Sequence, residues 1–130
     1  MDKKLFVLFV LLFFTLFAVN LYAKDYSLPK AEIYLKINSD ASVDVTEKIS
    51  FSVSGSYTYA YRDIPKGVWE ISNISVTENG NGIKSDITDN GSNTRITWYF
   101  AAKDELRIFT LSYRLEKAIV VYDDVAELYW

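Results

Sequence analysis

The sequence predicts an all-β protein, an antiparallel β-sandwich of immunoglobulin-like architecture preceded by an N-terminal signal or anchor helix. Three observations lead to this prediction. After residue 23, apolar and polar residues alternate with a period of two, which is the pattern of half-buried strands. Turn-forming clusters recur about every 8–12 residues, as in sandwiches and barrels, and no later stretch keeps a helical period. Residues 1–23, by contrast, are mostly apolar.

Residues 1–23 have the composition of a secretory signal peptide. Two lysines precede an apolar run over Leu5–Val19, and Ala23 is a small residue suited to the position before a cut. An uncleaved anchor is the alternative, because the apolar stretch approaches the ~20 residues that span a bilayer. Both interpretations export residues 24–130, since positive charge at the N-terminus stays inside. We therefore expect this part at the extracytoplasmic face of the cell membrane.

The first two strands are expected to form a hairpin. Residues alternate over Ala31–Asn38, with one apolar face, and again over Val43–Val53. Ser39–Ser42 separates the two runs and contains Asp40, a residue type that suits tight turns. Glu47 interrupts the second run because it falls on the apolar face.

A carboxylate buried without a partner is costly, so Glu47 needs an explanation. The strand bends there, or Glu47 is an inward-pointing charge that guards a sheet edge. The sharper alternative is a buried ion pair with Arg62, which shares a face with small and apolar residues. These alternatives stay open at the level of sequence.

The remaining strands follow from the same alternation and from the turns between them. Ala101–Glu105 joins two of these strands and has the composition of a connection or a single helical turn. The pattern predicts one β-sandwich domain over residues 24–130. The expected strands are Tyr57–Ile64, a bulged strand through Ile71 to Val76, an edge strand at Ile83–Ile87, Thr94–Phe100, Leu106–Leu115 and Ala118–Tyr122.

Composition excludes several functions. The 130-residue chain has no His and no Cys, which rules out thiol nucleophiles, His-dependent triads, disulfides and the usual zinc sites. The formal net charge of −3 argues against nucleic acid as a partner. We expect no cofactor.

Two groups of oxygen ligands have the chemistry to hold calcium. One comprises Asp123, Asp124 and Glu127, and the other Asp86, Asp89 and Asn90. Neither spacing matches the twelve-residue calcium loop, so solvated acidic loops are the simpler interpretation. Acidic residues at 123–127 also suggest a small hydrolase, the least favoured alternative.

Tyr57, Tyr59 and Tyr61 alternate along one predicted strand and are expected to share a face. Such a row suits stacking on sugar rings or on a peptide. Tyrosine is also a good strand residue that covers a sheet face without any ligand.

Four stretches, in this order and spacing, resemble the N-terminal part of predicted membrane proteins that share domain of unknown function 2207 (DUF2207). They are Asp40–Glu47, Tyr61–Pro65, Phe109–Arg114 and Val121–Trp130. The resemblance implies a signal peptide, an extracytoplasmic β-domain and transmembrane helices further along. It implies no catalytic residues, because no activity is established for the family.

Some positions match the family motifs and others depart from them. Motif positions are held by Glu47, Arg62, Asp63, Asp123, Asp124 and Trp130. Ala41 stands where relatives usually have Gly, and the chain ends at Trp130, where relatives continue. We therefore expect an open edge there, with Asp123, Asp124 and Trp130 joining the three tyrosines as a candidate interaction surface.

These observations predict a non-catalytic binding or interaction module in the cell envelope. A carbohydrate- or peptidoglycan-binding module is the alternative. The expected partners are an envelope protein or a glycan. Contact with the membrane would come through the leader or through a span beyond Trp130.

Overall fold

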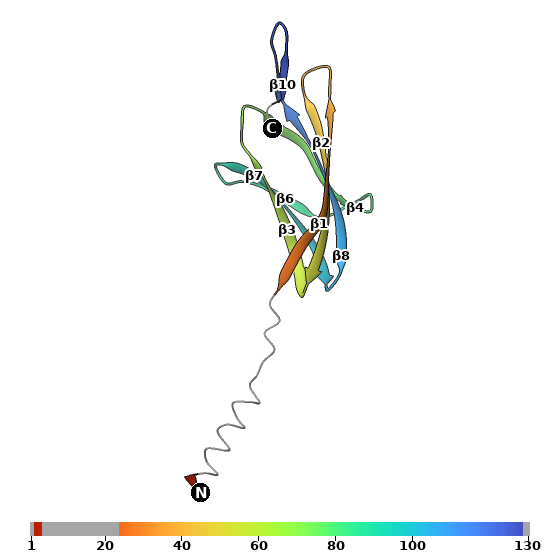
Figure 1. Ribbon diagram of the computed structural model, residues 1–130, viewed down its shortest axis with the longest axis vertical. Coiled ribbons are helices and arrows are strands. Elements are labelled where there is room, and N and C mark those ends of the chain that lie inside the picture. The colour runs from red at the N-terminus through yellow and green to blue at the C-terminus, as the bar shows by residue number, and fades with distance from the viewer. Residues whose placement is uncertain (1, 4–23, 129–130) are drawn as a thin grey trace.

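The computed structural model describes residues 2–3 and 24–128, so the predicted leader helix and Trp130 lie outside the described residues. The described chain is built from antiparallel strands, which confirms the all-β prediction (Figure 1). Among these residues, no helix is long and apolar enough to cross a bilayer. The strands are β1 (Asp25–Ile37), β2 (Val43–Ser54), β3 (Ser56–Pro65), β4 (Glu70–Glu78), β5 (Asn81–Gly82), β6 (Ser85–Asp89), β7 (Asn93–Lys103), β8 (Leu106–Glu116), β9 (Ile119–Val121) and β10 (Ala126–Leu128).

Two sheets of unequal width enclose the core. One has five strands in the order β1-β2-β8-β4-β5, and the other has three in the order β3-β7-β6. The apolar residues of β2, β8 and β7 face inward because strand side chains alternate between the two faces. Trp98, Phe109 and Leu111 are fully buried at the centre. The likeness to immunoglobulin domains stays a prediction.

The first hairpin forms as predicted, but β1 begins six residues earlier than expected, at Asp25 rather than Ala31. The pairing of β1 with β2 is irregular between Ser27 and Lys30, next to Pro29. Proline lacks a backbone N–H and tends to occur at strand edges and bulges. Because Pro29 interrupts the alternation of apolar and polar residues, the pattern did not predict the part of β1 that precedes it.

The expected half-burial of β1 is wrong. Its apolar residues lie opposite the buried face of β2, yet Ile33, Leu35 and Ile37 are 45%, 41% and 62% exposed. The reason is the unequal width of the sheets. The three-stranded sheet ends at β3, whose Arg62 contacts Glu47 of β2, so no strand of that sheet covers β1.

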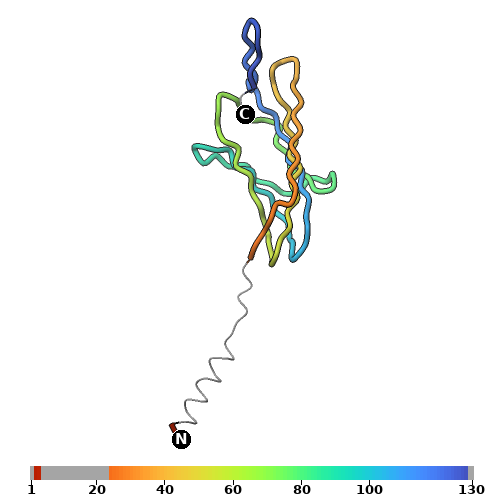
Figure 2. Tube along the Cα trace, in the orientation of Figure 1, coloured from red at the N-terminus to blue at the C-terminus, as the bar shows by residue number. Residues whose placement is uncertain are grey.

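The chain ends in a separate hairpin. The predicted strand Ala118–Tyr122 is present as β9, but it pairs only with β10, which the alternation pattern missed (Figure 2). The segment Ala101–Glu105 contains no helical turn, because β7 runs to Lys103 and the chain reverses at Asp104, which has a φ of 49°.

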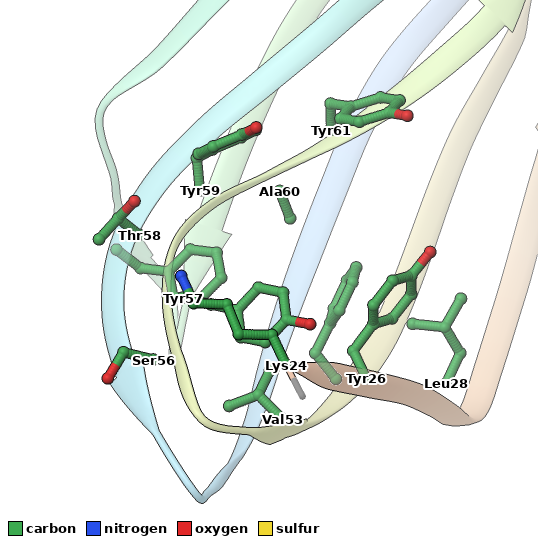
Figure 3. A pocket seen from close by; sticks show the side chains of 12 residues that line it. Lys24, Tyr26, Leu28, Val53, Ser56, Tyr57, Thr58, Tyr59, Ala60 and Tyr61 are labelled. Carbon is green, nitrogen blue, oxygen red and sulfur yellow. The ribbon is translucent and has the colours of Figure 1, made fainter. Parts of the chain in front are cut away.

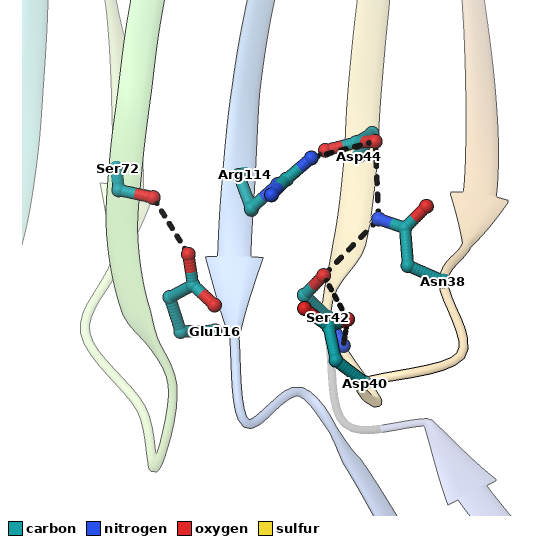
Figure 4. Close-up of polar contacts among 7 residues, drawn as sticks. All are labelled: Asn38, Asp40, Ser42, Asp44, Ser72, Arg114 and Glu116. Atoms are coloured by element: carbon teal, nitrogen blue, oxygen red, sulfur yellow. Dashed lines mark hydrogen bonds and ion pairs between the residues drawn. The ribbon is translucent and has the colours of Figure 1, made fainter.

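Polar contacts fasten the turn between β1 and β2 to its neighbours (Figure 4). Asp40 accepts hydrogen bonds from the backbone N–H and the hydroxyl of Ser42, at 3.0 and 2.6 Å. The amide of Asn38 donates to Ser42 and to Asp44, and Arg114 of β8 pairs with Asp44 at 2.7 Å. These contacts lower the pKa of Asp44, chiefly through the hydrogen bond from Arg114. We interpret the contacts of Asn38, Asp44 and Arg114 as structural, because they connect the turn to β2 and β8.

Ala41 in this turn has a φ of 66°, a conformation that favours glycine. We predict that Ala41→Gly stabilises the protein by about 1 kcal/mol, because it relieves the contact between Cβ and the carbonyl oxygen. Thermal unfolding measures this directly. Ala31→Gly, in the middle of β1, is the control and should lower the melting temperature; a fall for Ala41→Gly as well would contradict the prediction.

Glu78 of β4 forms a two-point ion pair with Arg107 of β8, with Nη2 and Oε2 2.7 Å apart. The hydrogen bonds from Arg107 lower the pKa of Glu78. A lowered pKa in the folded state gives stability that is present above the unfolded value, about 4.3, and is lost as pH falls through the folded value.

Glu78→Gln should therefore lower the free energy of unfolding by about 1 kcal/mol at pH 7. Near pH 2 it should have almost no effect, because protonated Glu78 is as neutral as the glutamine that replaces it. Melting temperatures at the two pH values test this. Glu70→Gln, which breaks an exposed pair with Lys117, should have a smaller effect at pH 7. An equal loss for Glu78→Gln at both pH values would rule out the ion pair as its cause.

Candidate functional site

A pocket of about 420 Å³ opens between β1 and β3, at the end of the sandwich where β1 begins (Figure 3). Aromatic and aliphatic side chains dominate its lining, and Lys24 is the one charged residue among the described residues that line it. The lining residues are Lys24, Tyr26, Leu28, Phe51, Val53, Ser56, Tyr57, Thr58, Tyr59, Ala60, Tyr61 and Phe100.

The pocket exists because the irregular start of β1 places aromatic rings beside the core. The ring of Tyr26 lies 6.2 Å from that of Phe51 and 6.1 Å from that of Tyr57, measured between centroids. Phe51 in turn packs edge-on against Trp98 and Phe109, at 6.0 and 5.9 Å. The bottom of the pocket is therefore formed by Phe51, which packs against the hydrophobic core. The rings of Tyr26 and Tyr57 form its sides.

The predicted single row of tyrosines is wrong. Pairing between β3 and β7 shifts between Tyr57 and Tyr59, so that Tyr57 lies opposite buried Ala102 and Tyr59 opposite exposed Tyr99. This irregularity keeps Tyr57 half-buried against Tyr26, whereas Tyr59 and Tyr61 are 55% and 51% exposed. The three tyrosines form parts of a pocket and its rim rather than a flat platform.

Cations sit over two of these rings. The Lys24 ammonium is 5.9 Å from the centroid of Tyr57, and the Arg95 guanidinium is 4.1 Å from that of Tyr61. Asp63 holds Arg95 in place through two hydrogen bonds of 2.7 Å. The Tyr61 ring is thus fixed on one face by a cation–π contact.

Sequence reasoning missed Tyr26 and Leu28, which form the β1 side of the pocket. The signal was present, since Tyr26 and Leu28 alternate with Asp25 and Ser27. The pattern was interrupted at Pro29, and only the pairing of β1 with β2 carries the strand across it.

The structure brings Glu47 and Arg62 together between the two sheets. Glu47 is 2% exposed, and its carboxylate accepts hydrogen bonds from Arg62 Nε at 2.9 Å and from the Tyr113 hydroxyl at 2.6 Å. Burial lowers the pKa of Arg62, but the hydrogen bond and the charge of Glu47 outweigh it, so that the pKa lies above its ordinary value. Strands from both sheets supply these groups, so the pair links the sheets.

The acidic segments are not assembled into a metal site. Asp123 and Asp124 lie exposed in the turn between β9 and β10. Asp86 accepts a hydrogen bond from Tyr99, and Asp89 pairs with Lys66. Among residues 2–3 and 24–128, no cluster of three or more carboxylates could hold a metal ion.

One of the comparisons with known proteins identifies a family. Residues 27–130 match the family described as "Predicted membrane protein (DUF2207) N-terminal domain". No curated protein and no solved structure matches the chain.

Removal of Arg62 should be far more costly than removal of an exposed lysine. Arg62→Met leaves the buried Glu47 carboxylate without its countercharge, and we expect a loss of about 3 kcal/mol. Lys66→Met breaks only an exposed pair with Asp89 and should cost less than about 1 kcal/mol. Urea or thermal unfolding of the two variants provides the comparison. Equal losses would show that the ion pair adds nothing particular to stability.

Proposed function

This chain belongs to the DUF2207 N-terminal domain family of predicted membrane proteins, and on that premise we propose that it is an exported, non-catalytic binding module. The apolar run and lysines of residues 1–23 support export to the extracytoplasmic face of the membrane. The packing of a five-stranded sheet against a three-stranded sheet supports the proposed likeness to immunoglobulin-like modules, which bind ligands on a rigid β-scaffold.

The observation that carries the proposal is the aromatic pocket between β1 and β3. Binding sites for small ligands are concave and mostly apolar, with a few polar groups that fix orientation. This pocket has that character, because rings from Tyr26, Tyr57 and Phe100 line it and the polar residues Ser56 and Thr58 belong to its lining.

The chemistry of the lining favours binding over reaction. Hydrolysis of a glycosidic bond usually needs two carboxyl groups that flank the bond. Among the described lining residues Lys24 is the one charged group, and no carboxylate accompanies it. The proposal is therefore a site that holds its ligand unchanged.

We propose a cell-envelope glycan as the ligand class, with an envelope protein as the alternative. Sugar rings stack on exposed aromatic faces, and their hydroxyl groups exchange hydrogen bonds with tyrosine, serine and threonine. Exposed Tyr59 and Tyr61 at the rim supply the faces, and Ser56 and Thr58 supply the hydroxyl groups.

A pull-down on purified cell-wall polysaccharide tests the proposal. We expect the protein to be retained, and the variant Tyr59→Ser/Tyr61→Ser to lose at least about tenfold in affinity, which corresponds to about 1.4 kcal/mol for two rings.

The matched control is Tyr122→Ser, which removes a ring that is 50% exposed and does not line the pocket. This variant should bind like the unaltered protein. Equal retention of all three proteins would show that the pocket does not bind the polysaccharide.

A further inference from the structure

Strand β1 is an open edge that carries an apolar face. It pairs with β2 on one side, and no described strand pairs with its other side. Ile33, Leu35 and Ile37 point to the core side of the sheet but remain largely exposed. Natural proteins seldom leave a long, flat, apolar edge uncovered, because its free backbone groups attract another strand.

The exposed edge is regular where this face lies. From Lys30 to Ile37 the register with β2 is unbroken, and the irregularity and Pro29 lie before this segment. The segment therefore offers an uninterrupted row of backbone groups for a further strand. On its outer face, opposite the apolar row, stand Lys30, Glu32, Tyr34 and Lys36.

We propose that β1 pairs with β1 of a second copy of this chain, antiparallel and centred on Tyr34. In that register Glu32 of each copy lies opposite Lys36 of the other, so two pairs of opposite charge form across the junction. On the core side, Ile33 lies opposite Leu35 and Ala31 opposite Ile37, again twice. A two-fold axis perpendicular to the sheet keeps both apolar rows on one face.

Neighbouring registers lack this complementarity. Centring the pair on Ile33 sets Lys30 against Lys36 twice, and centring it on Glu32 sets the two carboxylates against each other. Moving the centre to Leu35 leaves Lys36 opposite Tyr34 and removes the opposite-charge pairs. The sequence of β1 thus favours the register centred on Tyr34 over those around it.

The dimer is independent of the proposed ligand pocket. Its contacts run from Lys30 to Ile37, and none of these residues lines the pocket. Pairing would join two five-stranded sheets into one continuous sheet and would set the apolar rows of the two β1 strands side by side on one face.

Single-cysteine cross-linking of the full chain in its own membranes tests the proposal, and the chain has no cysteine to interfere. Residues directly opposite on antiparallel strands have Cβ atoms about 4.5–5.5 Å apart, close enough for a disulfide. Under mild oxidation, Tyr34→Cys should therefore give a species of twice the mass on a non-reducing gel, and reduction should remove it.

Lys48→Cys is the matched control. Lys48 is exposed on the same outer face but belongs to β2, one strand inward, so that its two copies would lie about 14 Å apart or more in the dimer. This variant should form no disulfide under the same conditions and should run at the mass of a single chain on the non-reducing gel. Absence of the Tyr34→Cys dimer, or equal cross-linking of the two variants, would overturn the proposal.

A mixed experiment tests the register. Chains with Glu32→Cys and size-tagged chains with Lys36→Cys should form a mixed disulfide when expressed together. Neither variant should cross-link to itself, because like positions then lie four residues apart along the strands, about 13 Å. Self-linked Glu32→Cys or Lys36→Cys would place the centre of the pairing elsewhere and overturn the stated register.

Discussion

The buried carboxylate of Glu47 is the constraint around which the two sheets are arranged. It lies on the inner face of β2 and takes hydrogen bonds from Arg62 of the opposite sheet and Tyr113 of β8. A charge in that position is tolerated only with such partners. The contact between Arg62 and Glu47 places β3 opposite β2. The position of β3 in turn decides how much of β1, the next strand of the wide sheet, is covered.

What lies beyond β3 is uncovered surface. The five-stranded sheet is wider than the three-stranded sheet, so no described strand covers the inner face of β1 at Ile33, Leu35 and Ile37. Near its start, Tyr26 turns toward Tyr57 and a pocket forms. Further along, Ile33, Leu35 and Ile37 remain exposed. The pocket and the open edge are two consequences of one mismatch in sheet width.

Family membership says what kind of protein this chain belongs to, whereas the structure shows which residues could bind a ligand. Membership places the chain among predicted membrane proteins, and it assigns no ligand or residue role. The structure supplies candidates for a ligand site and for structural residues. Aromatic rings around Phe51 line a concave site, and Asp44 and Arg114 form an ion pair between β2 and β8. A scaffold with a concave aromatic site suits an interaction domain.

The sequence by itself determined most of the strands and the unusual status of Glu47. Alternation is a local property, and it located β2 and β8 to within a residue or two. Only the tertiary structure decided which apolar faces are buried and which rings meet. Burial of β1 depends on how many strands the opposite sheet has, and the separation of Tyr57 from Tyr59 depends on a pairing irregularity with β7. Both are set by segments distant in the chain, so no pattern within a single strand reveals them.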